Sequence, residues 1–251
     1  MPAKKPGKKR LDVLLVERGL AESREKAQAM ILAGEVQADG TRAEKPGGRV
    51  AENALVEVHS RLQKYASRGG FKLEGALEDF AVDAAGRVCL DIGASTGGFT
   101  DCLLQHGARR VYAVDVTASQ LAWKLRQDSR VVMIEKNARE LSSADVSGPV
   151  DLVTIDVSFI SVEKVFGPAV RAARPGAEFL ILVKPQFELS RSEVGKGGIV
   201  REARLHDKAI ERVRRAASDA GLDVLGVRPS RLAGVEGNQE FFLHARRRGV
   251  E

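Results

Sequence analysis

The sequence predicts two domains: a small α+β domain, followed by a larger α/β domain with a mostly parallel, doubly wound sheet and an antiparallel closing strand. Three observations lead to this prediction. The chain has 251 residues, enough for one large or two modest domains with a sizeable core. Beyond residue 76, short apolar runs alternate with helical patterns, as in a parallel sheet covered by helices. The net charge of +6 falls within the first 72 residues, which hold 15 Lys and Arg against 9 Asp and Glu.

The front domain is predicted to contain two short helices and a pair of strands. Apolar side chains recur twice at helical spacing. Gly19-Leu20 ends the first helix, and Ser23 suits the N-cap of the second. An Asp-Gly turn then joins two short runs, as in a β-hairpin. The positions concerned are Leu11, Leu14 and Leu15, then Ala27, Met30 and Ile31, then residues 34–40 and 54–58, all within a domain of residues 10–59.

Two basic segments flank this domain. Residues 1–9 are predicted to be a basic tail. Residues 60–75 are predicted to be a basic linker, in which Gly69-Gly70 breaks the chain before a helix starts.

The larger domain is predicted over residues 76–246. Its strands are short apolar runs, and helical patterns separate most of them. A long helix near residues 201–220 precedes two further runs, which are predicted to close the sheet as an antiparallel edge. The predicted strands are residues 88–92, 111–115, 131–134, 150–156, 179–183, 224–227 and 240–245.

Composition excludes several classes of protein. No apolar run approaches the roughly 18 to 20 residues that span a bilayer, and the basic start lacks the apolar core of a signal peptide. We therefore expect a cytoplasmic protein with no membrane partner. Cys89 and Cys102 are too few for a disulfide framework or a metal cluster, so we expect buried thiols and no metal site. Clustered cations at the front favour an anionic polymer as partner; the alternative is a solvated basic tail.

A glycine-rich segment follows the first strand of the larger domain and opens a helix. Its glycines allow a sharp turn and a close approach to a ligand, and the helix start supplies free N–H groups. Ser95 stands where a dinucleotide motif has its second glycine, and no Lys-Ser or Lys-Thr of a P-loop follows. A pyrophosphate ligand is therefore disfavoured.

Two carboxylates near this segment suit a different ligand. Asp91, at the end of the first strand, suits a cationic group, and Asp115 ends the second strand 22 residues after Gly93, where a carboxylate can bind ribose hydroxyls. S-adenosylmethionine combines an adenosine with a positive centre, and Asn137 lies where it can meet the adenine. Capping or loop carboxylates are the alternative. The predicted cofactor-binding residues are Asp91, Gly93, Ser95, Thr96, Gly97, Gly98, Phe99, Thr100, Asp115 and Asn137.

Asp156 and Lys184 follow the fourth and fifth predicted strands. Ligands of open α/β sheets bind at the carboxyl ends of the strands, so both side chains are expected to face the same cleft. The alternative is that Lys184 forms a purely structural ion pair.

The front domain resembles the S4 RNA-binding domain. The resemblance rests on Arg10-Leu11-Asp12, Gly19-Leu20, a Ser-Arg-x-x-Ala pattern and an Ile-x-x-Gly-x-Val pattern. It implies an RNA-contacting face on the second helix, where a helix N-terminus already favours phosphate. The predicted RNA-binding residues are Arg10, Ser23, Arg24, Lys26 and, in the linker, Arg68.

Residues 10–246 as a whole resemble the TlyA group, also called the haemolysin A family, which joins an S4 domain to a Rossmann-like, FtsJ-like RNA 2'-O-methyltransferase dependent on S-adenosylmethionine. The motifs are residues 67–73, 91–101, 156–161, 184–187, 195–200 and 237–241. The resemblance implies a catalytic tetrad of Lys72, Asp156, Lys184 and Glu240. It also implies ribosomal RNA, free or in ribosomal subunits, as substrate, with cytidine ribose as the target. Residues 117–120 depart from the family, which commonly has glycines there.

The chemistry suits these residue types. A ribose 2'-hydroxyl is a weak nucleophile and must lose its proton as it attacks the methyl group. Lys184 could be the base if Lys72 lowered its pKa by repulsion, whereas Asp156 and Glu240 would act in the opposite direction. The alternative is that the tetrad orients the hydroxyl. Two other functions remain open: an RNA-binding protein without catalysis, and a cytolysin.

Overall fold

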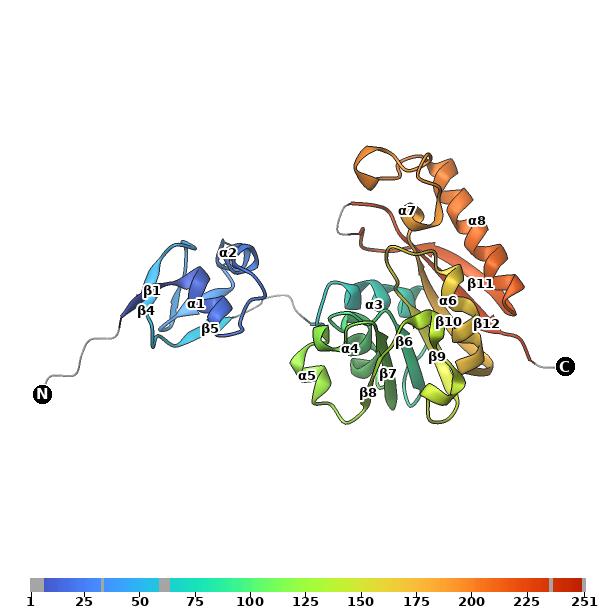
Figure 1. The fold of residues 1–251 in the computed structure, drawn as a ribbon, viewed down its shortest axis with the longest axis horizontal. Helices are drawn as coiled ribbons and strands as arrows, with labels where there is room; N and C mark the ends of the chain where they lie inside the picture. The colour runs from blue at the N-terminus through green and yellow to red at the C-terminus, as the bar shows by residue number, and fades with distance from the viewer. Residues whose placement is uncertain (1–6, 33, 59–63, 235–236, 250–251) are drawn as a thin grey trace, which may run out of the picture. The chain divides into compact units, whose positions relative to one another are not determined.

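The computed structural model describes residues 7–32, 34–58, 64–234 and 237–249, and the chain divides into two compact units, Met1–Gln63 and Lys64–Glu251 (Figure 1). Residues 1–6 of the expected tail and 60–63 of the expected linker lie outside the described residues. Each unit is considered by itself.

In the front unit, the two predicted helices pack on each other around a small apolar core. The predicted N-cap is confirmed, since Ser23 Oγ accepts the N–H of Lys26 at 3.2 Å. The strands are more numerous than predicted, because three of them are short and mostly polar and leave no apolar pattern. The core residues are Leu11, Leu15, Ala27, Ile31 and Val36. The helices are α1 (Leu11–Glu17) and α2 (Arg24–Leu32), and the strands are β1 (Lys8–Arg10), β2 (Val36–Ala38), β3 (Thr41–Arg42), β4 (Arg49–Ala51) and β5 (Val56–Val58).

These strands form two small antiparallel sheets. β2 lies between β3 and β5, and the predicted hairpin turn at Asp39-Gly40 joins β2 to β3. The predicted returning strand is β5, which pairs with β2 directly. β1 pairs with β4 and so ties Arg10 to the far end of the unit's sequence.

In the second unit, the predicted mostly parallel sheet with an antiparallel edge is confirmed. Its strand order is β11-β12-β10-β9-β6-β7-β8, and β12 runs antiparallel to both neighbours. Some strands are longer than predicted, since flanking charged residues hide their ends. The strands are β6 (Val88–Ile92), β7 (Arg110–Asp115), β8 (Val131–Glu135), β9 (Val150–Ile155), β10 (Ala173–Val183), β11 (Leu222–Pro229) and β12 (Phe241–Arg247).

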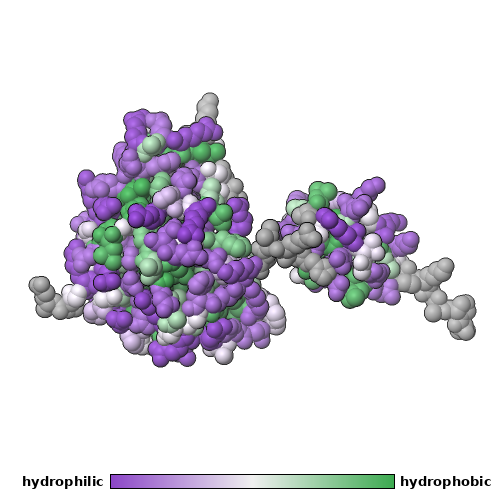
Figure 2. Space-filling model, turned by 180° about the vertical axis from the view of Figure 1, so that it is seen from behind, coloured by the Kyte–Doolittle hydropathy of each residue, from purple (hydrophilic) through white to green (hydrophobic). Residues whose placement is uncertain are grey.

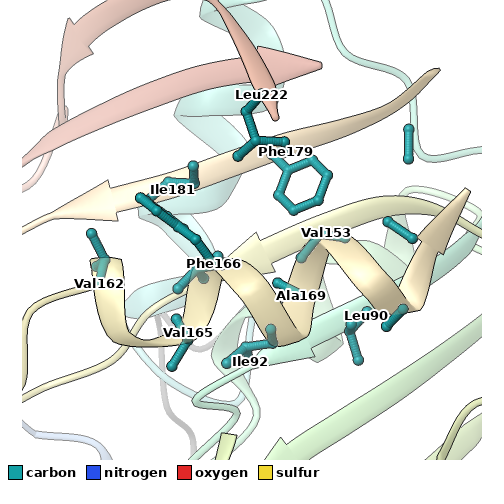
Figure 3. Packing of buried hydrophobic residues seen from close by; sticks show 14 of the residues in the cluster. Leu90, Ile92, Val153, Val162, Val165, Phe166, Ala169, Phe179, Ile181 and Leu222 are labelled. Carbon is teal, nitrogen blue, oxygen red and sulfur yellow. The ribbon is translucent and has the colours of Figure 1, made fainter. Parts of the chain in front are cut away.

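Helices cover both faces of this sheet, because successive strand residues point to opposite sides. Cys89 and Leu180 pack on the side of α3 and α4, while Leu90 and Ile181 pack on the side of α6 (Figure 3). The helices are α3 (Gly69–Asp79), α4 (Gly98–Gln105), α5 (Trp123–Arg126), α6 (Glu163–Ala172), α7 (Pro185–Glu188) and α8 (Ala203–Asp219), with 3-10 turns η1 (Ala118–Gln120), η2 (Ala138–Glu140), η3 (Ser143–Asp145) and η4 (Lys196–Gly198).

Both predicted buried thiols are confirmed: Cys89 and Cys102 are free and fully buried. Burial raises the pKa of each thiol to about 12, so neither is reactive at neutral pH. Over the described ranges, no helix combines the length and apolar character needed to cross a bilayer. The face drawn in Figure 2 is mainly hydrophilic, with hydrophobic residues in small separate areas.

The predicted linker needs one correction. Its Gly-Gly pair does not interrupt the chain but forms the first turn of α3, which begins at Gly69. Residues 64–68 already belong to the second unit: Gln105 Nε2 donates to the Lys64 carbonyl at 2.6 Å, and the N–H of Ala66 donates to Asp101 Oδ2 at 2.7 Å. Gly70 is required for packing, since a Cβ there would lie 2.3 Å from the Tyr65 side chain.

Candidate active site and RNA-binding surface

The glycine-rich loop between β6 and α4 is held in a shape that only glycine permits at two positions. Gly93 has φ +87°, and a Cβ there would lie 2.2 Å from the Asp156 carbonyl oxygen, so the loop passes directly against the end of β9. Gly97 has φ +94°, and a Cβ would lie 2.2 Å from the Leu125 side chain. Any side chain at these positions would strain the backbone and displace its neighbours.

Asp91 lies beneath this loop. Its side chain is fully buried and accepts hydrogen bonds from Thr100 Oγ1 at 2.7 Å and Thr154 Oγ1 at 3.0 Å. Burial raises the pKa of this carboxyl to about 7. Direct contact with a cationic ligand was expected, and the structure corrects this: Asp91 ties the start of α4 to β9 and supports the loop from inside.

Three other predicted cofactor residues have little side-chain access. Phe99 and Thr100 are buried, and Gly98 is packed so closely on α3 that a Cβ would lie 2.2 Å from Ser67 Oγ. These residues can reach a ligand only through their backbone N–H groups at the start of α4. Ser95 and Thr96 lie in the loop before them, with Ser95 exposed at a positive φ of 48°.

Asp115 ends β7 and is partly exposed. Its Oδ2 accepts the N–H of Ser95 at 2.9 Å, and its Oδ1 accepts the N–H of Thr117 at 3.1 Å. Each carboxylate oxygen has a second lone pair for a ligand hydroxyl. The segment that departs from the family pattern thus remains tied to Asp115.

Asn137 follows β8, whose Glu135 pairs with Asp115 in the strand register. Its Oδ1 accepts the N–H of Arg139 at 3.1 Å and caps η2, leaving the amide NH₂ as its donor group. Asp115 and Asn137 therefore stand at the carboxyl ends of adjacent strands, next to the glycine loop. This arrangement fits the adenosine part of S-adenosylmethionine.

The predicted tetrad forms two lysine–carboxylate pairs at the same sheet edge. Lys184 Nζ lies 2.5 Å from Asp156 Oδ1 and donates to Ser158 Oγ at 2.8 Å. Lys72 Nζ donates to Glu240 Oε2 at 2.6 Å, across 168 residues of sequence. Each lysine therefore has its own carboxylate.

Strand register explains why these residues meet. Asp156 directly follows β9, and its N–H donates to the Ile92 carbonyl at the end of β6. In β10 and β12, Val183 pairs with Phe241, so Lys184 and Glu240 flank the last paired position. Lys72 reaches Glu240 from the first turns of α3.

The pairs lie at the base of the edge rather than on open surface. The side chains of Lys72 and Lys184 are only 11% and 10% exposed, and that of Glu240 is 3% exposed. Gly234 leaves room for Glu240, since a Cβ there would lie 2.6 Å from Oε1. Such shielding strengthens electrostatic interactions with a bound group.

One further residue beside the tetrad was missed as a candidate. Phe159, three residues after Asp156, is 89% exposed and has φ 67°, which is an outlier for a bulky residue. Its ring centroid lies 5.4 Å from that of Phe187, three residues after Lys184. The signal in the sequence was an aromatic residue within each motif that carries a tetrad residue.

The predicted RNA-binding cations of the front unit are accessible. The side chains of Arg10, Arg24 and Lys26 are 46%, 52% and 56% exposed. Ser23 serves as the helix cap described above, so its hydroxyl is already engaged. Arg68, in the second unit, is exposed immediately before α3.

The strand order, the glycine loop and the carboxylate after the second parallel strand define a methyltransferase that uses S-adenosylmethionine, preceded by an RNA-binding type of domain. A model described as FtsJ-like methyltransferase matches residues 65–247, and one described as S4 domain matches residues 9–56. The chain belongs to the FtsJ-like methyltransferase family. The predicted resemblance and cofactor class are confirmed.

Similar proteins cover almost the whole chain. A Mycobacterium tuberculosis protein named 16S/23S rRNA (cytidine-2'-O)-methyltransferase TlyA is 48% identical over 94% of this chain and 89% of its own length. Hemolysin A of Brachyspira hyodysenteriae is 42% identical over 94% of this chain and 98% of its own. The solved structure of a hemolysin-type protein from Streptococcus thermophilus has a TM-score of 0.75 and 42% identity, covering 98% of this chain and 90% of that one.

Proposed function

We propose that this enzyme transfers a methyl group from S-adenosylmethionine to the 2'-hydroxyl of a cytidine in ribosomal RNA, acting on ribosomal subunits or their RNA. The observation that carries the proposal is the convergence of two lysine–carboxylate pairs beside the glycine loop. The name of the M. tuberculosis relative supports the same reaction and substrate. Such a substrate would place the reaction in the cytoplasm.

The four tetrad residues must hold a ribose hydroxyl in line with the methyl group. When bound, S-adenosylmethionine supplies a methyl on a sulfonium, which leaves as a neutral thioether as the new O–CH₃ bond forms. Lys184, fixed by Asp156 and Ser158, presents an N–H to the ribose oxygen. Lys72, fixed by Glu240, borders the other side of the same edge. Orientation of this kind removes much of the entropic barrier.

The 2.5 Å contact with Asp156 supports an orienting role for Lys184. A general base would have to be a neutral amine, which would give up this ion pair. The two roles predict different pH profiles. With a neutral lysine as base, the single-turnover rate should rise tenfold per pH unit on the approach to the lysine pKa. With an orienting ammonium, the rate should be nearly flat from pH 7 to 9.

The exposed Phe159 ring supports a nucleic-acid substrate. Proteins that bind single-stranded or flipped nucleotides stack bases on aromatic side chains. Phe159 is three residues from the catalytic carboxylate and rests on Phe187, so its position is defined. We propose that it stacks on the target base while the tetrad holds the ribose.

The direct test is methyl transfer from methyl-labelled S-adenosylmethionine to unmodified ribosomal RNA, followed by mapping of ribose methylation. Lys184→Ala should lower transfer by roughly 100-fold or more, while cofactor affinity measured by calorimetry stays within a few fold. Lys208→Ala is the matched control, because Lys208 is 63% exposed on α8 and pairs only with Glu193 among the described contacts. Equal loss of cofactor binding in Lys184→Ala would contradict the assigned role.

The two alternatives have distinct signatures. An RNA-binding protein without catalysis would bind ribosomal RNA but leave it unlabelled, and added S-adenosylmethionine would not raise its melting temperature. A cytolysin would release dye from erythrocyte-lipid vesicles at concentrations where no methyl transfer is detected.

A further inference from the structure

Asp12, in the first turn of α1, has no exposed surface, yet long side chains from the surface bind both its oxygens. Arg10 donates through Nε to Oδ1 at 3.0 Å and through Nη2 to Oδ2 at 2.8 Å. Arg24 Nη2 and Gln28 Nε2 donate to Oδ2 at 3.2 and 2.9 Å, and the N–H of Val13 donates to Oδ1 at 2.9 Å. The Arg10 guanidinium, helped by these other donors, holds the pKa of Asp12 well below its usual range.

This carboxylate joins two cations that the sequence separates by 14 positions. Arg10 ends β1, and Arg24 begins α2. Both Nη2 atoms bind the same oxygen, so two guanidinium groups that would otherwise repel each other are held side by side. Gly47 backs Arg10: a Cβ there would lie 3.4 Å from Nη1 and Nη2.

The two guanidinium groups keep most of their binding capacity. Each has five N–H donors, of which Asp12 takes two from Arg10 and one from Arg24. Both side chains remain about half exposed, at 46% and 52%. Two cations and one carboxylate leave the cluster with a net charge of +1.

We propose that Asp12 is a positioning residue that holds Arg10 and Arg24 together as a preorganised clamp for one phosphate of the RNA backbone. The inference rests on the proposed function and adds the place and the means of phosphate binding. A side chain that is already held loses less conformational entropy on binding than a free one. Guanidinium–phosphate contacts are also short, charge-assisted and able to use two donors at once.

The proposal reverses the sign expected from charge alone. Asp12→Asn makes the front unit more positive by one charge, so simple attraction predicts tighter RNA binding. Loss of the clamp predicts weaker binding. Glu22→Gln is the matched control, because it adds the same charge at a side chain that is 71% exposed and pairs with Lys26 at 3.3 Å.

The experiment measures the affinity of the full chain for a folded ribosomal RNA fragment and for an unrelated RNA duplex, each over a range of salt. We expect Asp12→Asn to weaken binding to both RNAs about fivefold to tenfold near 0.1 M salt, and to lower the log-log salt slope by about 1. Glu22→Gln should strengthen binding about twofold. Unchanged or tighter binding by Asp12→Asn would overturn the proposal.

Asp12→Glu tests geometry without changing charge, and it should also weaken binding severalfold because its longer side chain displaces both guanidinium groups. Hydrogen exchange over residues 11–58 of the full chain checks folding. Unfolding of the front unit in both variants would overturn the proposal, since Asp12 would then stabilise the fold rather than organise charge. If the wild type fails to methylate ribosomal RNA, the proposed function fails, but these binding comparisons still decide the role of Asp12.

Discussion

The two units of the chain each contain a fully buried carboxylate, and the two carboxylates have opposite properties. In the front unit, guanidinium groups surround Asp12 and lower its pKa. In the second unit, two threonine hydroxyls bind Asp91, and burial raises its pKa to about 7. Burial alone therefore does not decide the protonation of a carboxyl group; the charge of its partners does.

The difference matches the task of each unit. Asp12 keeps its charge and presents cations to the outside, which suits the attraction of a polyanion. Asp91 is bound by neutral groups and joins the loop helix to the sheet, which suits a stable platform for a cofactor. The predictions below test this division.

Removal of residues 1–60 is expected to have the largest effect on RNA binding. RNA affinity should fall roughly 100-fold near 0.1 M salt, because each lost phosphate contact removes about 0.9 from the log-log salt slope on duplex nucleic acid. Cofactor binding should stay nearly intact, since Asp115 and Asn137 lie beyond the cut. Filter binding over a salt series checks the first statement and calorimetry the second. An unchanged salt slope would transfer the RNA anchor to the second unit, with Arg68 as the next candidate.

Asp115→Ala should weaken S-adenosylmethionine binding at least about tenfold, because a hydrogen bond to a charged acceptor contributes about 1.5–3 kcal/mol. The loop N–H of Ser95 also loses its acceptor. Asp128→Ala is a suitable control, since this carboxylate pairs locally with Arg130. Calorimetric affinity equal to that of the wild type would make Asp115 a purely structural residue.

The raised pKa of Asp91 predicts the pH dependence of the second unit. The folded state binds this proton more tightly than the unfolded state, so stability is highest at low pH and falls as pH rises from about 4 towards about 7. Between pH 5.5 and 7.5 the loss should be about 2 kcal/mol. Asp91→Asn should remove it, as seen by urea unfolding at both pH values.

Asp12 should show the reverse dependence. Its lowered pKa stabilises the front unit above about pH 4, and this contribution is lost only as pH falls further. The front unit should thus be insensitive to pH over the range in which the second unit changes. A pH slope that survives in Asp91→Asn would assign it to another group, such as the buried Glu188, whose pKa is also raised by burial.

Phe159→Ala is expected to have the smallest effect of the four. Loss of one base–aromatic stack is worth about 1–3 kcal/mol, so methyl transfer should fall about fivefold or more, with cofactor affinity unchanged. Phe159→Tyr should retain most of the activity because its ring can still stack. Full activity of Phe159→Ala would remove the base contact from the proposed site.

Much of the fold and half of the tetrad geometry could be derived from the sequence. Parallel strands place their carboxyl ends at one sheet edge, so Asp156 and Lys184, each directly after an apolar run, were expected to share a cleft, and they lie 2.5 Å apart. Lys72 and Glu240 came from the family resemblance alone. They lie 168 positions apart, and only the antiparallel β12 and the packing of α3 bring them into contact.

The character of the buried carboxylates was decided by tertiary structure. A sequence shows that Asp91 follows a strand, which is compatible with either a ligand contact or a buried support. The choice depends on Thr154, which lies on β9, 63 positions away. Likewise, Asp12 is an ordinary acidic residue in a helix start until β1 and α2 bring Arg10 and Arg24 to the same oxygen. Periodicity and strand ends are local and can be read along the chain, whereas the partners of a buried charge are set by which distant elements pack against it.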